Sequence, residues 1–332
     1  MKRQIENVVR ACVPASVVTL ALLTAGCSGK KDDSASFATP EEAVAALVTA
    51  LQSDDKAAMS KLLGPGTDEL LSSGDPVADK ADRAQFLASY QVKHSLMPEG
   101  DDKMIIVTGQ DDWPMPIPIV KRDGRWVFDG AAGADEIIYR RVGANELGAI
   151  EVCRGYAAAQ YDYAAEGHDG DPAGIYALKL LSDPGLHNGL YWETAADEPA
   201  SPGGAFVASA AAEGYAATDV RTPYHGYFYR QLYAQGSNAN GGARDYFKDG
   251  VLTEGFALIA WPADYGSSGV QTFLVNQDGV VFQKDLGEET AAAADAIKTF
   301  DPDSSWTAVD AAAPVDATAE APSPGAATEP AT

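Results

Sequence analysis

PYHGYFYRQLYAQGSNANGGARDYF, residues 223–247, contains seven aromatic rings, one His and two Arg in twenty-five positions. Successive side chains of a β-strand point to opposite faces of its sheet. Alternation places one set on one face (His225, Tyr227, Tyr229 and Tyr233) and a second set on the other (Tyr224, Phe228, Arg230 and Leu232). Such a run is typical of a strand covered by a helix on one face and by a loop on the other. We expect Tyr227 and Tyr229 to pack on a helix that carries Cys153 and Ala157.

The same stretch has a second interpretation, in which it forms a ligand-binding patch. Its candidate residues are Tyr224, His225, Tyr227, Arg230, Arg244 and Asp245. In this patch His and Arg side chains would present hydrogen-bond donors beside aromatic rings. His225 and Arg230 fall on opposite faces of a regular strand, so the patch requires a bulge, for which Gly226 is the natural position.

The surroundings of this stretch predict a domain over residues 143–309. Leu147, Ile150, Cys153, Ala157 and Tyr161 recur every three or four positions, which indicates a long helix that we expect to begin at a cap on Asn145. Strands are predicted in YHGYFYRQLYAQ, GFALIAWPADYG and QTFLVNQDGVVFQKD, the last with a turn at Asp278-Gly279. One long helix on an antiparallel sheet is the expected arrangement.

A separate domain is predicted over residues 37–142. Thr39 is an expected N-cap, because Pro40 and two acidic residues follow it at the start of a helical pattern. Further helices are expected in DKAAMSKLLGPG, where Gly64 ends the helix, and in RAQFLASYQ. Strands are expected in MIIVTG and PIPIVKR, followed by a hairpin that turns at Asp123-Gly124. The whole chain is therefore expected to be α+β.

The ends of the chain differ from its centre. Residues 1–26 read as a signal peptide, because a basic start precedes a short apolar segment. LLTAGC resembles the lipobox of bacterial lipoproteins, which implies cleavage before Cys27 and a lipid on its thiol; an ordinary secretory signal cut near Ala25 is the alternative. Residues 27–36 form a polar tether after the lipidated Cys, and the Ala/Pro/Thr-rich tail 310–332 is expected to be disordered.

Charge and motifs exclude several function classes. Removal of residues 1–26, which carry three basic and one acidic residue, takes the formal net charge from −24 to −26. Such a chain repels nucleic acid. No nucleophile elbow, zinc-protease motif, P-loop or dinucleotide fingerprint is present, and we expect no cofactor and no metal.

Two polar segments and one cysteine have structural interpretations. NQDG (276–279) is typical of a hairpin turn, and EGHDGDPAG is typical of a polar loop. Cys153 is expected to be a small buried residue, with a catalytic thiol as the alternative.

Three resemblances add to this interpretation. Motifs such as GAIEVCRGYAAAQYDYA and GFALIAWPADYGSSGVQTFLVNQDGVVFQKDLG, between residues 37 and 309, resemble family 2950 of the domains of unknown function, which are bacterial envelope proteins. The start TPEEAVAALVTALQSDD and the DGRWVFDG hairpin resemble the cone-like domains of the nuclear-transport-factor-2 and cystatin type. The order of the elements after residue 143 is similar to that of type II pseudopilin heads.

These resemblances imply a protein of the bacterial cell envelope, on the periplasmic side of a membrane and most simply the outer one. The expected function is a non-catalytic interaction or assembly role, with the membrane reached through a lipid on Cys27 and another envelope protein as the partner. The alternative is a periplasmic hydrolase or ligand-binding protein whose site lies around His225, Arg230 and Arg244. An enzyme would show a pocket in which His225 meets a carboxylate.

Overall fold

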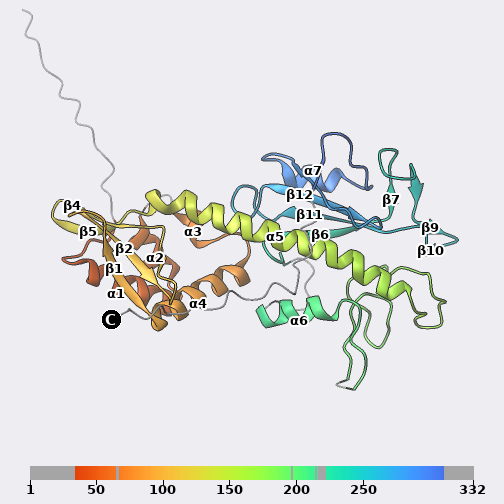
Figure 1. Ribbon diagram of the computed structural model, residues 1–332, viewed down its shortest axis with the longest axis horizontal. Helices are drawn as coiled ribbons and strands as arrows, with labels where there is room; N and C mark the ends of the chain where they lie inside the picture. The colour runs from red at the N-terminus through yellow and green to blue at the C-terminus, as the bar shows by residue number, and fades with distance from the viewer. Residues whose placement is uncertain (1–33, 65–66, 196, 214, 216–221, 310–332) are drawn as a thin grey trace, which may run out of the picture. The chain divides into compact units, whose positions relative to one another are not determined.

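The computed structural model describes residues 34–309, apart from 65–66, 196, 214 and 216–221 (Figure 1). The predicted signal peptide, Cys27 and the tail 310–332 therefore lie outside the described residues. Helices and antiparallel sheets occur together, which confirms the mixed α+β class. The finer cone-like and pilin-like arrangements remain predictions.

Four helices open the described chain: α1 (Pro40–Gln52), α2 (Lys56–Leu63), α3 (Asp68–Leu71) and α4 (Pro76–Val92). The Thr39 hydroxyl accepts the backbone N–H of Glu42 at 3.3 Å, so the predicted cap of α1 is confirmed. The Glu42 carboxylate in turn accepts the N–H of Ala38, the residue before the cap, at 3.0 Å. Gly64, at φ +92°, ends α2 as predicted.

The first sheet follows these helices and contains β1 (His94–Pro98), β2 (Lys103–Thr108), β3 (Trp113–Pro114), β4 (Ile119–Arg122) and β5 (Arg125–Phe128). Its antiparallel order is β1-β2-β4-β5, with β3 also paired to β2. Asp123 and Gly124 have φ of +51° and +78°, which confirms the predicted turn between β4 and β5. Strand β1 has no equivalent in the sequence prediction. His94, on β1, stacks on Tyr90 with ring centroids 3.8 Å apart.

Helix α5 (Gly130–Ala164) is 35 residues long and begins well before the predicted cap at Asn145. The prediction was wrong because Asn145 is buried within the helix and donates its side-chain amide to Ser268 O at 2.9 Å. The predicted domain boundary at 142/143 thus lies inside a continuous helix rather than in a linker.

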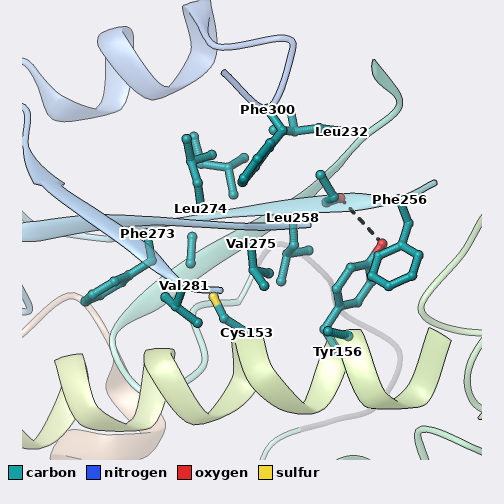
Figure 2. Packing of buried hydrophobic residues seen from close by; sticks show 14 of the residues in the cluster. Cys153, Tyr156, Leu232, Phe256, Leu258, Phe273, Leu274, Val275, Val281 and Phe300 are labelled. Carbon is teal, nitrogen blue, oxygen red and sulfur yellow. Dashed lines mark hydrogen bonds between the residues drawn. The ribbon is translucent and has the colours of Figure 1, made fainter. Parts of the chain in front are cut away.

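The second large sheet contains β6 (Tyr227–Leu232), β11 (Ala257–Pro262), β12 (Gln271–Asn276), β13 (Phe282–Asp285) and β14 (Thr307–Ala308). All its pairings are antiparallel, in the order β14-β13-β12-β11-β6. Helix α5 packs against β11 and β12, and α7 (Thr290–Ala296) contacts β11. Figure 2 shows Cys153 and Tyr156 of α5 on one side of the sheet and Leu232, Leu274 and Phe300 on the other.

The remaining elements are short. They are α6 (Gly204–Glu213), the strand pair β7 (Ala234–Gln235) and β8 (Arg244–Asp245), and the pair β9 (Phe247–Lys248) and β10 (Val251–Leu252). Helix α6 has no equivalent in the sequence prediction.

Buried apolar side chains form two clusters. One draws on residues between 35 and 137, and the other on residues between 149 and 309. All described residues nevertheless belong to one compact unit that starts at Ser34. The prediction that 37–142 and 143–309 pack independently stays a prediction.

Candidate functional site

Two aromatic rings of β6 contribute to the core: Tyr227 lies within it and Tyr229 packs against it. Tyr227 is 0% exposed, its hydroxyl donates to Gln271 O at 2.9 Å, and its ring lies 5.7 Å from that of Phe273. The Tyr229 hydroxyl donates to Tyr224 O at 3.2 Å. Burial raises the pKa of Tyr229 well above its ordinary value, and the nearby Cys153 adds to this effect. Both rings lie in the cluster that contains Cys153 and Ala157 of α5, where the sequence predicted them.

His225 lies in a turn rather than on the strand where alternation placed it. Tyr224 and Tyr227 exchange both backbone hydrogen bonds, at 2.9 and 3.1 Å, so the two residues between them form a tight turn. His225 has φ +51° and Gly226 has φ +69°. Both angles fit a turn of type I′. The bulge that the binding patch required at Gly226 is therefore replaced by a turn that precedes β6.

The predicted binding patch is divided among several places. Arg230 donates to the carbonyls of Ala294 and Ile297 at 2.6 and 2.8 Å, and so binds the C-terminal end of α7. Arg244 and Asp245 lie on β8, where both are exposed. Arg230 and Asp245 do share one pocket, of about 430 Å³. His225 lines a different cavity, and Tyr227 is enclosed in the core.

Asp75 organises the neighbourhood of His225. Its Oδ1 caps α4 by accepting the N–H groups of Val77 and Ala78, both at 3.1 Å. Its Oδ2 accepts the Tyr215 hydroxyl at 2.6 Å and the Gly226 N–H at 3.1 Å. Asp75 is 0% exposed. One carboxylate thus joins the start of α4 to the turn that carries His225.

A cavity of about 680 Å³ opens beside this turn, and we call it the junction cavity. Apolar side chains from the first four helices form much of its wall, among them Leu47, Leu51, Met59, Leu63, Leu70 and Phe86. Charged and aromatic residues also line it: Asp79, Asp82, Arg83, Trp113, Arg140, Arg141 and His225. Its size and mixed lining are those of a small-molecule site.

Three arginines face the junction cavity, and each is held by the protein. Arg83, whose side chain is 14% exposed, pairs with Asp54 at 3.0 Å. Arg140 donates to Glu136 at 2.7 Å, and its guanidinium lies 4.8 Å from the centre of the Trp113 ring. Arg141 donates to the carbonyls of Glu69 and Leu70 at 2.8 and 2.9 Å. These contacts fix the guanidinium groups and leave further N–H donors on each of them.

Two carboxylates share the lining with these arginines. Asp79 accepts the N–H and hydroxyl of Ser73, at 3.1 and 2.7 Å. Burial raises the pKa of Asp82 above its ordinary value; the charge of Arg141 opposes this shift and that of Asp79 adds to it. Asp82 therefore takes up a proton more readily than an exposed carboxylate, and its negative charge weakens as pH falls.

The model of the family described as Protein of unknown function (DUF2950) matches residues 34–309. The chain belongs to this family. No curated protein and no solved structure matches the chain.

Other candidate chemistry in this DUF2950 member has a structural explanation. Burial raises the pKa of Cys153 to about 12, so the side chain is a neutral thiol at physiological pH. His168 stacks on Tyr163, and its Nε2 lies 2.9 Å from the carbonyl oxygen of the same residue. Within the described ranges, no group of three or more His, Cys, Asp or Glu side chains is arranged to hold a metal ion. The same residues contain no helix long and apolar enough to cross a membrane.

The sequence predicts neither the junction cavity nor the role of Asp75. Asp75 precedes Pro76 and a helical pattern, so a cap could have been expected there. Its contacts to Tyr215 and Gly226, 140 and 151 positions away, leave no local pattern. The cavity likewise brings together residues from Leu47 to His225 that share no motif.

Proposed function

We propose that this protein is a lipid-anchored component of the bacterial envelope that binds an anionic amphiphile in the junction cavity and releases it unchanged. The observation that carries the proposal is the pairing of an apolar wall with three arginines in one cavity of about 680 Å³. The cone-like arrangement of α1–α4 on the first sheet and the pilin-like arrangement of α5 on the second belong to the same proposal, as does an envelope protein that exchanges ligand with the cavity.

The apolar wall supports a ligand with a hydrocarbon part. Leu47, Met59 and Phe86 come from three different helices and converge on the same space. Transfer of apolar surface from water into such a space is favourable by roughly 25 cal/mol per Å². A ligand that carried only polar groups would gain nothing from this wall and would leave it hydrated.

The arginines support a negative charge on the ligand. The full chain has a formal net charge of −24, so three arginines facing one cavity run against its general composition. Carboxylate and phosphate groups match the planar fork of an arginine side chain. The Asp79 carboxylate is already occupied by hydrogen bonds from Ser73, and burial raises the pKa of Asp82, so the guanidinium groups are the ligand contacts that the proposal assigns to an anion.

Arg140→Gln is expected to weaken binding of cis-parinaric acid, a fluorescent fatty acid, roughly tenfold or more, because a charge-assisted hydrogen bond contributes about 1.5–3 kcal/mol. Arg140 is suited to this test since it pairs with the exposed Glu136 and packs on the Trp113 ring. Fluorescence titration of the purified protein measures the change.

Arg122→Gln is the matched control. Arg122 also forms an ion pair, at 2.8 Å to Asp129, but it does not line the cavity. The methyl ester of the same acid should bind wild type and Arg140→Gln equally. The proposal fails if the ester and the acid bind wild type with one affinity, or if both variants lose affinity alike.

The membrane anchor is tested separately. The LLTAGC segment predicts that Cys27→Ala moves the protein out of the membrane fraction, because two or more acyl chains at about 0.8 kcal/mol per buried methylene hold a protein firmly. Fractionation with mass spectrometry of the mature N-terminus measures this. A wild-type protein that is fully soluble with a free thiol at Cys27 would disprove the anchor and leave the cavity proposal intact.

A second candidate function is hydrolysis, because His225 and Asp82 line the same cavity. The ring of His225 packs beside Gly148 and lies 4.2 Å from the Tyr224 ring. His225→Gln should keep the melting temperature and the affinity for cis-parinaric acid, and should leave any envelope phenotype unchanged. A stable, ligand-binding His225→Gln protein with a null phenotype would favour the hydrolase.

A further inference from the structure

A second cavity, of about 210 Å³, lies between α5, α6 and the large sheet, and we call it the α6 cavity. Val152 and Ala159 contribute from α5, Val207 and Ala210 from α6, and Leu258 from β11. No charged side chain is among its described lining residues. This cavity is not part of the function proposed above.

The buried hydroxyl groups in the wall of the α6 cavity are already engaged. The Tyr156 hydroxyl donates to Ala257 O at 3.4 Å and accepts hydrogen bonds from the side chains of Gln160 and Gln231. The Tyr229 hydroxyl donates to Tyr224 O. Burial raises the pKa of both phenols, so neither can become a charged partner. A polar ligand would have to lose its water without recovering these hydrogen bonds.

Helix α6 is fitted closely over this space. A Cβ atom at Gly155 of α5 would overlap the ring of Phe206, so the glycine allows the two helices to approach. At the start of α6, the N–H of Gly203 donates to Leu190 O at 2.6 Å. Helix α6 is therefore held by the contact between Phe206 and Gly155 and by the hydrogen bond of Gly203 at its N-terminal end. The space between α6 and the sheet remains unfilled.

We propose that the α6 cavity is a binding site for a neutral, apolar molecule about the size of an aromatic ring. An apolar cavity of ~150 Å³ in another protein stays dry and takes up benzene or xenon. The α6 cavity, at about 210 Å³, is somewhat larger and is partly open at its surface, and its described lining carries no charge. The ligand chemistry is the opposite of that expected for the junction cavity, where arginines line the wall.

The two cavities are neighbours at one turn. Tyr224 lines the α6 cavity, whereas the next residue, His225, lines the junction cavity. The Tyr215 ring, which also lines the junction cavity, meets the Tyr224 ring edge-on with centroids 4.9 Å apart. Because the two linings differ in charge, a neutral apolar probe tests the α6 cavity and an anionic probe tests the junction cavity.

The test uses toluene as a probe of wild type and of two variants of α6. Ala210→Phe places a ring in the cavity and should abolish toluene binding measured by calorimetry. Ala208→Phe adds the same ring to the exposed face of α6, outside the lining, and should leave binding as in wild type. Both variants should bind cis-parinaric acid like wild type, which separates this site from the junction cavity.

Xenon-pressurised crystals of the wild-type protein give a measurement that needs no variant. Xenon density between Val152 and Val207 is the expected result. The proposal is overturned if toluene does not bind wild type, if xenon is absent from this cavity, or if Ala208→Phe and Ala210→Phe lose toluene binding equally.

Discussion

Tyr227→Ala is expected to lower the free energy of unfolding by about 3–5 kcal/mol, as removal of buried aromatic rings does. Tyr227 is 0% exposed and packs beside Phe273 in the cluster shared by α5 and the sheet. Gly269 lies so close to the Tyr227 ring that a Cβ atom would overlap it, which shows how completely the space is filled. Chemical denaturation followed by fluorescence measures the loss.

Tyr227→Phe is the control for this experiment. It keeps the ring and removes only the hydroxyl that donates to Gln271 O, a hydrogen bond with a net contribution of about 0.5–1.5 kcal/mol. Phe should therefore be much less costly than Ala. If Ala and Phe destabilise equally, or if Ala is nearly neutral, the ring is not part of the core and the structural interpretation of residues 223–247 is wrong.

Local features of this fold were accessible from the sequence. The Thr39 cap, the Gly64 helix end and the Asp123-Gly124 turn each depend on a few adjacent residues, and all three occur as predicted. The packing of Tyr227 and Tyr229 with the same apolar cluster also follows from alternation along one strand. Caps, turns and strand faces are set by short-range geometry, so a single sequence contains enough information to predict them.

Features set by distant contacts were not accessible. Asn is a residue type favoured at helix N-caps. The side chain of Asn145 nevertheless donates to Ser268 O, and the helix continues through this position. Tertiary hydrogen bonds of this kind override local preference. His225 was assigned to the strand by parity, whereas φ of +51° places it in a turn. Because His225 lies in this turn and not on the strand, its side chain lines the junction cavity rather than the predicted binding patch.

Asp75→Ala is expected to destabilise the protein by about 3 kcal/mol or more. Loss of an N-cap contributes about 1 kcal/mol, and each buried donor left unsatisfied adds about 1–3 kcal/mol. The Asp75 carboxylate accepts from Val77, Ala78, Tyr215 and Gly226, and the residue is 0% exposed. Because the site is closed to solvent, water cannot readily replace the carboxylate as the acceptor for these donors.

Asp75→Asn separates the two roles of this side chain. The retained oxygen can still accept the N–H groups of Val77 and Ala78, so the α4 cap survives. The new amide nitrogen replaces the oxygen that accepts from Gly226, and two donors then face each other. Calorimetry measures the unfolding of residues 37–142 and of 143–309. In Asp75→Asn and Asp75→Ala the two unfolding transitions should lie further apart than in wild type, because the bonds from Asp75 to Tyr215 and Gly226 are weakened or lost. Wild-type melting of Asp75→Asn would mean that this carboxylate acts only as a helix cap, and the turn at His225 would have to be positioned by the Gly148 contact instead.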